Sequence, residues 1–286
     1  MTRYFYNTGT PEEEEVHATI LPLLVNMFGK ENMVMAEVGV WDGNSLKLYI
    51  DRLKQLNGKV YLIDWWKGST QVESGLNMEY KEDAYEGVYQ QVLDIIDKHD
   101  AKENVVILRG DCVEMAKQLQ DEELDLCFLD AGHSYEECKR DIELFYPKVK
   151  KGGVLSGDDM DSVHSFHHYL SRAGTFTEEE ISKDAVEGKG HPGVLQAVYD
   201  YFGTDVAPYD GGWYSFRGYR MVRGVFGLVP DEKSLLLEQT HPAKQTEDMW
   251  AKFQNNIKIL EGGFAIEMDY LHASIIPPKG FEQKSD

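Results

Sequence analysis

Short apolar runs, separated by glycine turns and by amphipathic segments, dominate the first two thirds of the chain. Met33–Val38 and Lys59–Ile63 are each typical of a buried strand, and a helix with an apolar face begins near Leu46 between them. Similar runs end at Leu108 and Leu129, and another stops just before Gly157. Strands that alternate with helices predict an α/β fold built on a mostly parallel sheet.

Helical patterns also occur near both ends of the chain. Thr10 and Pro11 followed by four glutamates resemble a helix start, with a cap, a first-turn proline and an acidic first turn. Glu247–Leu260 has the apolar periodicity of an amphipathic helix. We therefore divide the chain into an N-terminal helical cap at 1–30, a core domain at 31–225 and a C-terminal extension at 226–286 that serves as a lid or in oligomerisation.

Acidic residues stand where the predicted strands end. Asp64, Asp111 and Asp130 follow the second, third and fourth strands, and Asp158 and Asp159 follow the fifth. The carboxyl ends of parallel strands meet at one edge of the sheet, where such folds bind small molecules. Grouped carboxylates repel one another without a cation, so Asp130, Asp158 and Asp159 predict a metal site. Helix capping by Asp111 and a solvated turn at the aspartate pair are the alternatives.

The turn after the first strand is rich in glycine. Gly39 and Gly43 let the backbone approach a ligand closely. Asp64 lies about 20 residues beyond Gly43, a spacing at which an acid accepts hydrogen bonds from ribose hydroxyls. The G-x-G-x-x-G pattern of dinucleotide-binding turns is absent, which disfavours a nicotinamide cofactor.

These residues resemble the class I S-adenosylmethionine-dependent methyltransferases, whose first motif is E/D-x-G-x-G-x-G. The motif here reads Glu37, Gly39, Trp41 and Gly43, and Ser45 completes the G-x-S that follows in related small-molecule enzymes. The resemblance implies a Rossmann-like domain with a mostly parallel seven-stranded sheet and helices on both faces. It also implies that the core domain at 31–225 binds S-adenosylmethionine.

Within this superfamily the chain looks most like the metal-dependent O-methyltransferases of sugars and natural products. That resemblance implies Mg²⁺, or another hard divalent cation, on Asp130, Asp158 and Asp159. The residues expected at the cofactor are Glu37, Gly39, Val40, Trp41, Gly43, Ser45, Asp64, Trp65, Asp111, Cys112 and Asp130. Asp130 and His133 are expected to act in catalysis, His133 as the general base because histidine titrates near neutrality. A capping or supporting role for His133 is the alternative.

Two longer intervals lie beside the predicted site. The first insert, near 65–80, starts next to Asp64 and is interpreted as a lid. The second insert, near 160–190, is rich in histidine and acid and should border the acceptor pocket. Within it, His164, His167 and His168 have a spacing that can bind transition metals, although an exposed helix explains it equally well. Substrate specificity is expected to lie in these two inserts.

Composition narrows the range of partners. The 286 residues carry a formal net charge of −21, which repels phosphate backbones and disfavours nucleic acid as a partner. No apolar run approaches the roughly 20 residues that span a bilayer, so no membrane partner is expected. Three cysteines without a C-x-x-C pair suit reduced thiols in the cytoplasm. A homo-oligomer is left open.

The expected function is therefore transfer of a methyl group from S-adenosylmethionine to a hydroxyl of a small molecule or sugar, assisted by a divalent cation. One alternative is a metal-independent N-methyltransferase of a small amine, in which the acids would bind the cationic amine. Another is a non-catalytic S-adenosylmethionine-binding regulatory protein, for which the C-terminal extension would be the interaction region.

Overall fold

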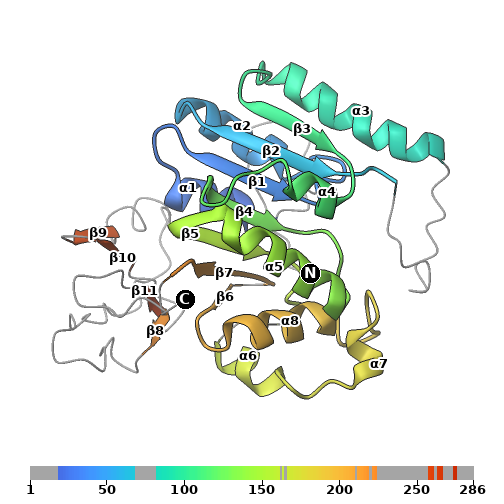
Figure 1. Ribbon diagram of the computed structural model, residues 1–286, viewed down its shortest axis with the longest axis vertical. Coiled ribbons are helices and arrows are strands. Elements are labelled where there is room, and N and C mark those ends of the chain that lie inside the picture. The colour runs from blue at the N-terminus through green and yellow to red at the C-terminus, as the bar shows by residue number, and fades with distance from the viewer. Residues whose placement is uncertain are drawn as a thin grey trace, which may run out of the picture.

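The computed structural model describes residues 19–67, 82–161, 163, 166–209 and 211–218, and four short strands between 221 and 275. A seven-stranded sheet lies at its centre, in the order β3-β2-β1-β4-β5-β7-β6 (Figure 1). The strands are β1 (Val34–Val38), β2 (Lys59–Asp64), β3 (Val105–Arg109), β4 (Leu124–Leu129), β5 (Val149–Gly157), β6 (Ala207–Tyr209) and β7 (Gly212–Phe216). The first five strands are parallel, and β7 is antiparallel to both of its neighbours. The predicted mostly parallel seven-stranded sheet is confirmed.

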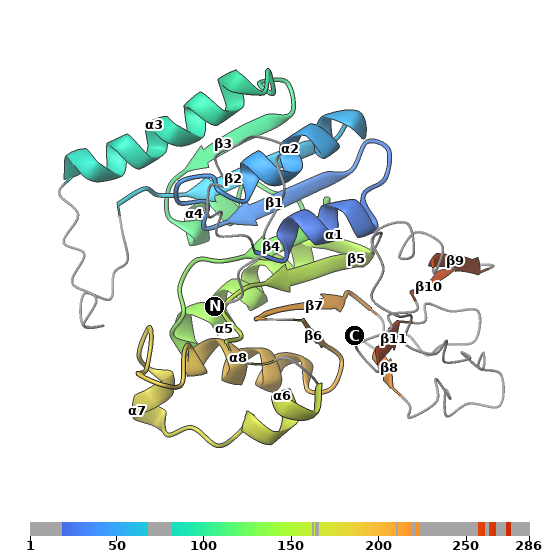
Figure 2. The same ribbon diagram turned by 180° about the vertical axis from the view of Figure 1, so that it is seen from behind.

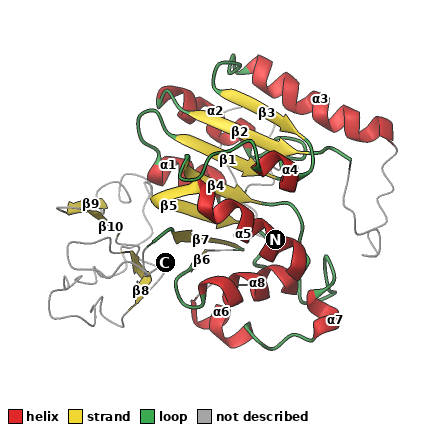
Figure 3. Ribbon diagram, viewed as in Figure 1, coloured by secondary structure: helices red, strands yellow, loops and turns green. Residues whose placement is uncertain are grey.

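Helices cover both faces of the sheet (Figures 2 and 3). One face packs against α1 (Leu21–Phe28), α2 (Leu46–Gln55) and α3 (Glu82–Lys98), and the other against α4 (Cys112–Ala116), α5 (Tyr135–Phe145), α6 (Phe166–Arg172) and α8 (Pro192–Phe202). The short helices η1 (Tyr146–Lys148) and α7 (Glu178–Ile181) lie in the connections. Two apolar clusters result, one on each side of the sheet. Burial of the strands on both faces explains their continuous apolar character in the sequence.

The late hairpin of β6 and β7 belongs to the core. Trp213, Tyr214 and Phe216 are at most 2% exposed, and β7 pairs with β5 along Val154–Gly157. These aromatic side chains are therefore packing residues at the edge of the sheet.

The C-terminal strands form a second sheet, in the order β8-β11-β10-β9. Its strands are β8 (Met221–Arg223), β9 (Ile257–Leu260), β10 (Gly263–Ile266) and β11 (Ala273–Ile275). The predicted helix at Glu247–Leu260 is wrong for its last four residues, because β9 pairs antiparallel with β10 and strand pairing overrides the local apolar period.

Several predicted features lie outside the described residues. They are the rest of the helix predicted at Glu247–Leu260, the helix start at Thr10, and the first insert beyond Lys67. Among the described helices, none combines the length and the apolar character that crossing a membrane requires.

Candidate functional site

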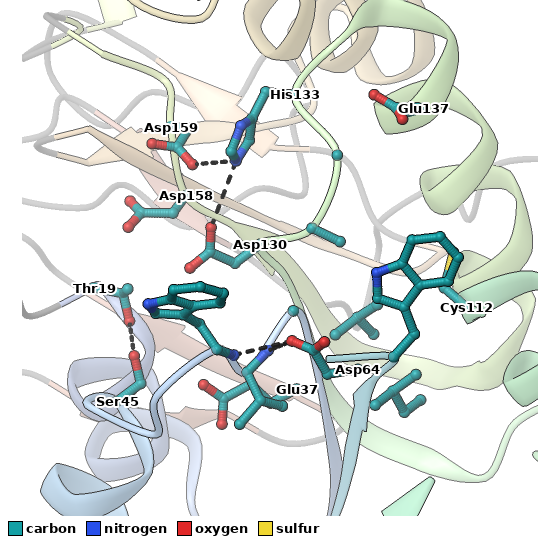
Figure 4. Close-up of a pocket in the computed structure, with 18 of the residues that line it drawn as sticks. Thr19, Glu37, Ser45, Asp64, Cys112, Asp130, His133, Glu137, Asp158 and Asp159 are labelled. Carbon is teal, nitrogen blue, oxygen red and sulfur yellow. Dashed lines mark hydrogen bonds and ion pairs between the residues drawn. The ribbon is translucent and has the colours of Figure 1, made fainter. Parts of the chain in front are cut away.

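A cavity of about 580 Å³ opens at the carboxyl edge of the parallel strands (Figure 4). It is lined by all but one of the predicted site residues, namely Glu37, Gly39, Val40, Trp41, Ser45, Asp64, Trp65, Asp111, Cys112, Asp130, His133, Asp158 and Asp159. Gly43 is the exception. A Cβ on Gly43 would lie 3.0 Å from Ile95 of α3, so this glycine serves close packing of the turn on the helix rather than contact with the cavity.

Gly39 lets the first strand touch the loop that carries Asp130. It has a φ of +85°, which side chains disfavour, and a Cβ there would lie 1.8 Å from the carbonyl oxygen of Asp130. The Asp130 N–H donates to the carbonyl of Val38 at 2.7 Å. The glycine turn and the acidic loop therefore meet through their backbones.

Asp64 holds the glycine turn in place. Its Oδ2 accepts the N–H groups of Val40 at 2.9 Å and of Trp41 at 3.0 Å, as Figure 4 shows, and its Oδ1 accepts the N–H of Trp66 at 2.7 Å. The Asp64 carboxylate thus accepts hydrogen bonds from the protein's own backbone. Its predicted role toward the ribose hydroxyls stays a prediction.

The two consecutive tryptophans after β2 have different surroundings. Trp66 is 1% exposed, donates its Nε1 hydrogen to the Trp41 carbonyl at 2.8 Å, and has its ring centroid 4.8 Å from that of Tyr89. Trp65 lines the cavity. Only the first tryptophan is therefore placed to contact a ligand, consistent with its selection from the sequence.

Asp111 and Cys112 begin α4 at the rim of the cavity. Asp111 accepts the Val113 N–H at 2.9 Å, so the alternative interpretation as a helix cap is confirmed. The Cys112 thiol lies 3.2 Å from Asp141 Oδ1. Burial and the Asp141 charge raise the pKa of the thiol to about 12, which keeps Cys112 neutral and unreactive.

Glu37 lies beneath the turn as a buried acid. It is 2% exposed, and the Tyr49 hydroxyl donates to its Oε2 at 2.6 Å. Burial raises the pKa of Glu37 to about 8, with the charges of Asp130 and Asp64 acting in the same direction. The residue is therefore largely a neutral carboxylic acid at pH 7.

His133 and three aspartates occupy the opposite side of the cavity. Pairing of Leu129 with Gly157 brings the ends of β4 and β5 together. The Nε2 of His133 lies 2.9 Å from Asp159 Oδ2 and 4.0 Å from Asp130 Oδ1 (Figure 4). Its Nδ1 lies 2.8 Å from Asp184 Oδ1. The ring is therefore held between carboxylates on both sides.

The crowding of these groups spreads their pKa values apart. Burial raises the pKa of Asp130 to about 6, with Asp159 acting in the same direction and His133 opposing it. Burial and the charges of Asp130 and Asp159 raise the pKa of Asp158 well above its usual range. Burial acts to raise the pKa of Asp159, but the cationic form of His133 lowers it. Burial also opposes the charged form of His133, yet the carboxylates raise its pKa well above the usual value. The site favours an added positive charge.

The side chains on this side of the cavity include some of the predicted ligands of a divalent cation. Asp130, His133 and Asp159 each offer a ligand atom, and these atoms lie within 4.8 Å of one another. Carboxylate oxygens are the ligands that hard divalent ions prefer. Asp158 lines the same cavity, but among the described residues it joins none of the candidate ligand groups. Asp130 and Asp159 are thus the better-placed ligands of the predicted three.

Residues 36–160 match the family model described as a methyltransferase domain. The match covers the glycine turn, Asp64 and the acidic edge, and the strand order agrees with the class I methyltransferase fold. This part of the chain is therefore similar to a methyltransferase domain, in agreement with the resemblance stated from the sequence.

Solved structures with a similar arrangement include known methyltransferases. The O-methyltransferase TomG from Streptomyces achromogenes, solved with its cofactor, is 13% identical with a TM-score of 0.45, over 71% of this chain and 82% of that one. Cofactor-bound Rv0187 from Mycobacterium tuberculosis (MTB) is 12% identical with a TM-score of 0.44, over 69% of this chain and 77% of that one. No curated protein matches the sequence. At these identities the likeness concerns the fold alone.

The second insert and the residue that follows it bring further ionisable side chains to this site. Asp184 contacts His133, His191 contacts Asp159, and Asp161 contacts His191, although none of the three was predicted as a site residue. The abundance of histidine and acid in the insert was the available signal, but it pointed to other histidines. His164 lies outside the described residues, and His167 and His168 join none of the ligand groups found among those described.

Proposed function

We propose that this protein is an S-adenosylmethionine-dependent methyltransferase that transfers the methyl group to a hydroxyl of a small molecule or sugar with the help of a divalent cation. The observation that carries the proposal is a single cavity with the glycine turn on one side and the His133 cluster on the other. A donor held by the turn would direct its methyl group toward an acceptor held by the cluster. Holding two reactants in such geometry contributes about 7–11 kcal/mol to catalysis.

Asp130 and Asp159, with Asp158 beside them, would hold the cation. When bound, it would supply orientation of the acceptor hydroxyls and a lowered pKa for the one that reacts. The three side chains come from the ends of two adjacent strands, so packing of the sheet fixes their separation. A rigid support of this kind is what a metal ligand set requires.

His133 is the proposed general base. Its Nε2 faces the two proposed metal ligands, where an acceptor hydroxyl would lie, and Asp184 fixes the ring through Nδ1 at 2.8 Å. A cation on Asp130 and Asp159 would offset the carboxylate charge that raises the pKa of His133, so that the neutral imidazole could take the proton of the acceptor hydroxyl at Nε2.

Charge in the cavity favours a neutral or cationic acceptor. Asp64, Asp130, Asp158 and Asp159 all line it. A phosphorylated acceptor would meet repulsion there unless the cation offset it. A small cationic amine is the second candidate acceptor, since carboxylates can bind an ammonium group directly.

The first test is calorimetric titration of S-adenosylhomocysteine, with Mg²⁺ and with a chelator. Micromolar binding in both conditions supports a donor site made by the turn. A panel of catechols, sugars and primary amines, assayed for methyl transfer with and without Mg²⁺, then separates the candidates. Transfer to a hydroxyl that stops on chelation supports the proposal, whereas chelator-resistant transfer to an amine contradicts it.

A further inference from the structure

The two carboxylate oxygens of Asp159 face different neighbours. Its Oδ2 faces His133 Nε2 at 2.9 Å, on the side of Asp130. Its Oδ1 lies 3.4 Å from His191 Nδ1, which in turn lies 2.5 Å from Asp161 Oδ2. One carboxylate therefore joins two groups of candidate ligands.

The second group is mixed in its chemistry. Asp159, Asp161 and His191 offer two carboxylates and one imidazole, with ligand atoms within 4.8 Å of one another. Imidazole together with carboxylate suits Mn²⁺, Fe²⁺, Co²⁺ or Zn²⁺, whereas Mg²⁺ prefers oxygen ligands alone. The side chains are about one fifth to one quarter exposed, from 19% for Asp161 to 25% for Asp159. The group is therefore partly open, and Asp159 also lines the cavity.

The backbone around the second group is shaped for this contact. Gly190, directly before His191, has a φ of +69°, and a Cβ on it would lie 2.4 Å from the Cβ of Asp161. Only glycine lets the two segments approach so closely. The Arg172 guanidinium donates to the carbonyls of Asp161 and Lys189, each at 2.8 Å, and ties the same two segments together.

We propose that Asp159 bridges two metal ions, the second of which is a transition-metal ion bound by Asp159, Asp161 and His191. The first ion is the one in the proposed function, on Asp130 and the other oxygen of Asp159. Two ions bridged in this way lie about 3.5–4 Å apart in known two-metal sites. The second ion ties the insert at 160–190 to the end of β5, beside the acceptor side of the cavity. His133 is not among its ligands and stays available as the base.

Mn²⁺ is the probe, because it accepts both oxygen and imidazole ligands. Full-length protein freed of metal by a chelator is titrated with Mn²⁺ and followed by equilibrium dialysis and by electron paramagnetic resonance. The expected result is two equivalents bound per chain, with a spin-coupled signal once the second equivalent binds. A single equivalent with an uncoupled signal, or no binding at all, in the wild-type protein overturns the proposal without recourse to any variant.

Variants then locate the second ion. In His191→Gln and Asp161→Asn the stoichiometry should fall from two to one and the coupled signal should vanish. The matched control is His99→Gln, which removes a histidine that also contacts an aspartate, Asp51 at 3.0 Å, outside the cavity. It should keep two equivalents. Retention of two equivalents in His191→Gln contradicts the assignment.

This experiment also separates the two-metal proposal from the proposed function. One equivalent that is lost in Asp130→Asn but kept in His191→Gln would leave the first ion in place and overturn only the second. Binding of S-adenosylhomocysteine depends on neither ion, so its calorimetric titration reports on the donor site whatever the metal count is.

Discussion

On the side of the cavity formed by β1 and β2, the Asp64 carboxylate accepts three backbone N–H groups. On the side formed by β4 and β5, the carboxylates of Asp130 and Asp159 instead face the imidazole of His133. The first side satisfies its charge with fixed backbone dipoles. The second balances its charges against one another, and their pKa values move apart as a result.

The difference matches the two tasks that the proposed function assigns to one cavity. Backbone hydrogen bonds hold the turn in one shape before any ligand arrives, which suits a cofactor that the domain binds in the same way each time. A cluster of side chains with unbalanced charge changes state when a cation or proton binds. Substitutions on the donor side should therefore lower the folding stability, and substitutions on the acceptor side should lower catalysis.

Asp130→Ala should have the largest effect. Removal of this proposed metal ligand should lower methyl transfer about 1,000-fold, the scale on which loss of one group that stabilises the transition state is felt. The affinity for S-adenosylhomocysteine should change much less, because the turn is held by other contacts. Initial rates and calorimetry on the same preparation measure both. Unchanged activity contradicts the metal site.

Glu37 should make folding stability fall as the pH rises. Its pKa is about 8 in the folded chain and 4.5 when exposed, so the folded state holds the proton more tightly. The free energy of unfolding should then decrease between pH 4.5 and pH 8 and level off above, by about 3–5 kcal/mol. Urea denaturation at several pH values measures the slope. Glu37→Gln should flatten it, and equal slopes in the two proteins contradict the assignment.

Gly39→Ala tests the point where the two sides meet. The added Cβ would clash with the Asp130 carbonyl at 1.8 Å, in a backbone conformation that alanine disfavours. We expect a loss of about 2–3 kcal/mol in the free energy of unfolding. The control is Gly87→Ala, in α3, where a Cβ meets nothing within 4 Å. That change should stabilise the protein by about 0.5–1 kcal/mol.

Asp64→Asn should have the smallest of the four effects. The amide offers one acceptor oxygen in place of two and turns N–H donors toward backbone N–H groups. We expect a loss of about 1–2 kcal/mol in the free energy of unfolding and weaker binding of S-adenosylhomocysteine, with an unchanged Mn²⁺ count. Asp51→Asn, at a carboxylate that is 68% exposed, is the control and should change stability by less than about 0.5 kcal/mol. A lower Mn²⁺ count in Asp64→Asn would show that the two sides are coupled.

Local patterns were sufficient for most of the fold. The apolar runs located the central strands, because a strand buried on both faces must be apolar along its whole length. Residues 257–260 are the counterexample: their helical period was real, but pairing of β9 with β10 decided their structure. The apolar periodicity of a short segment does not show whether another segment will pair with it as a strand.

The sequence by itself determined the glycine turn and the presence of an acidic edge. Strand ends in a parallel sheet converge whatever the details of packing, so Asp64, Asp130 and the aspartate pair could be placed together. Only the tertiary structure decided which acid of the pair turns toward His133. Neighbouring side chains point in different directions, and Asp159 adopts a φ of +59°, which is uncommon for a residue other than glycine.

The tertiary structure likewise decided that Asp161, Asp184 and His191 would reach the same site. Their insert contains only short helices, so its path is set by contacts with the sheet and with α8 rather than by its own sequence period. The sequence thus determined which residue types were available at the edge of the sheet, and packing determined which of them met, because contacts between distant segments depend on the whole fold.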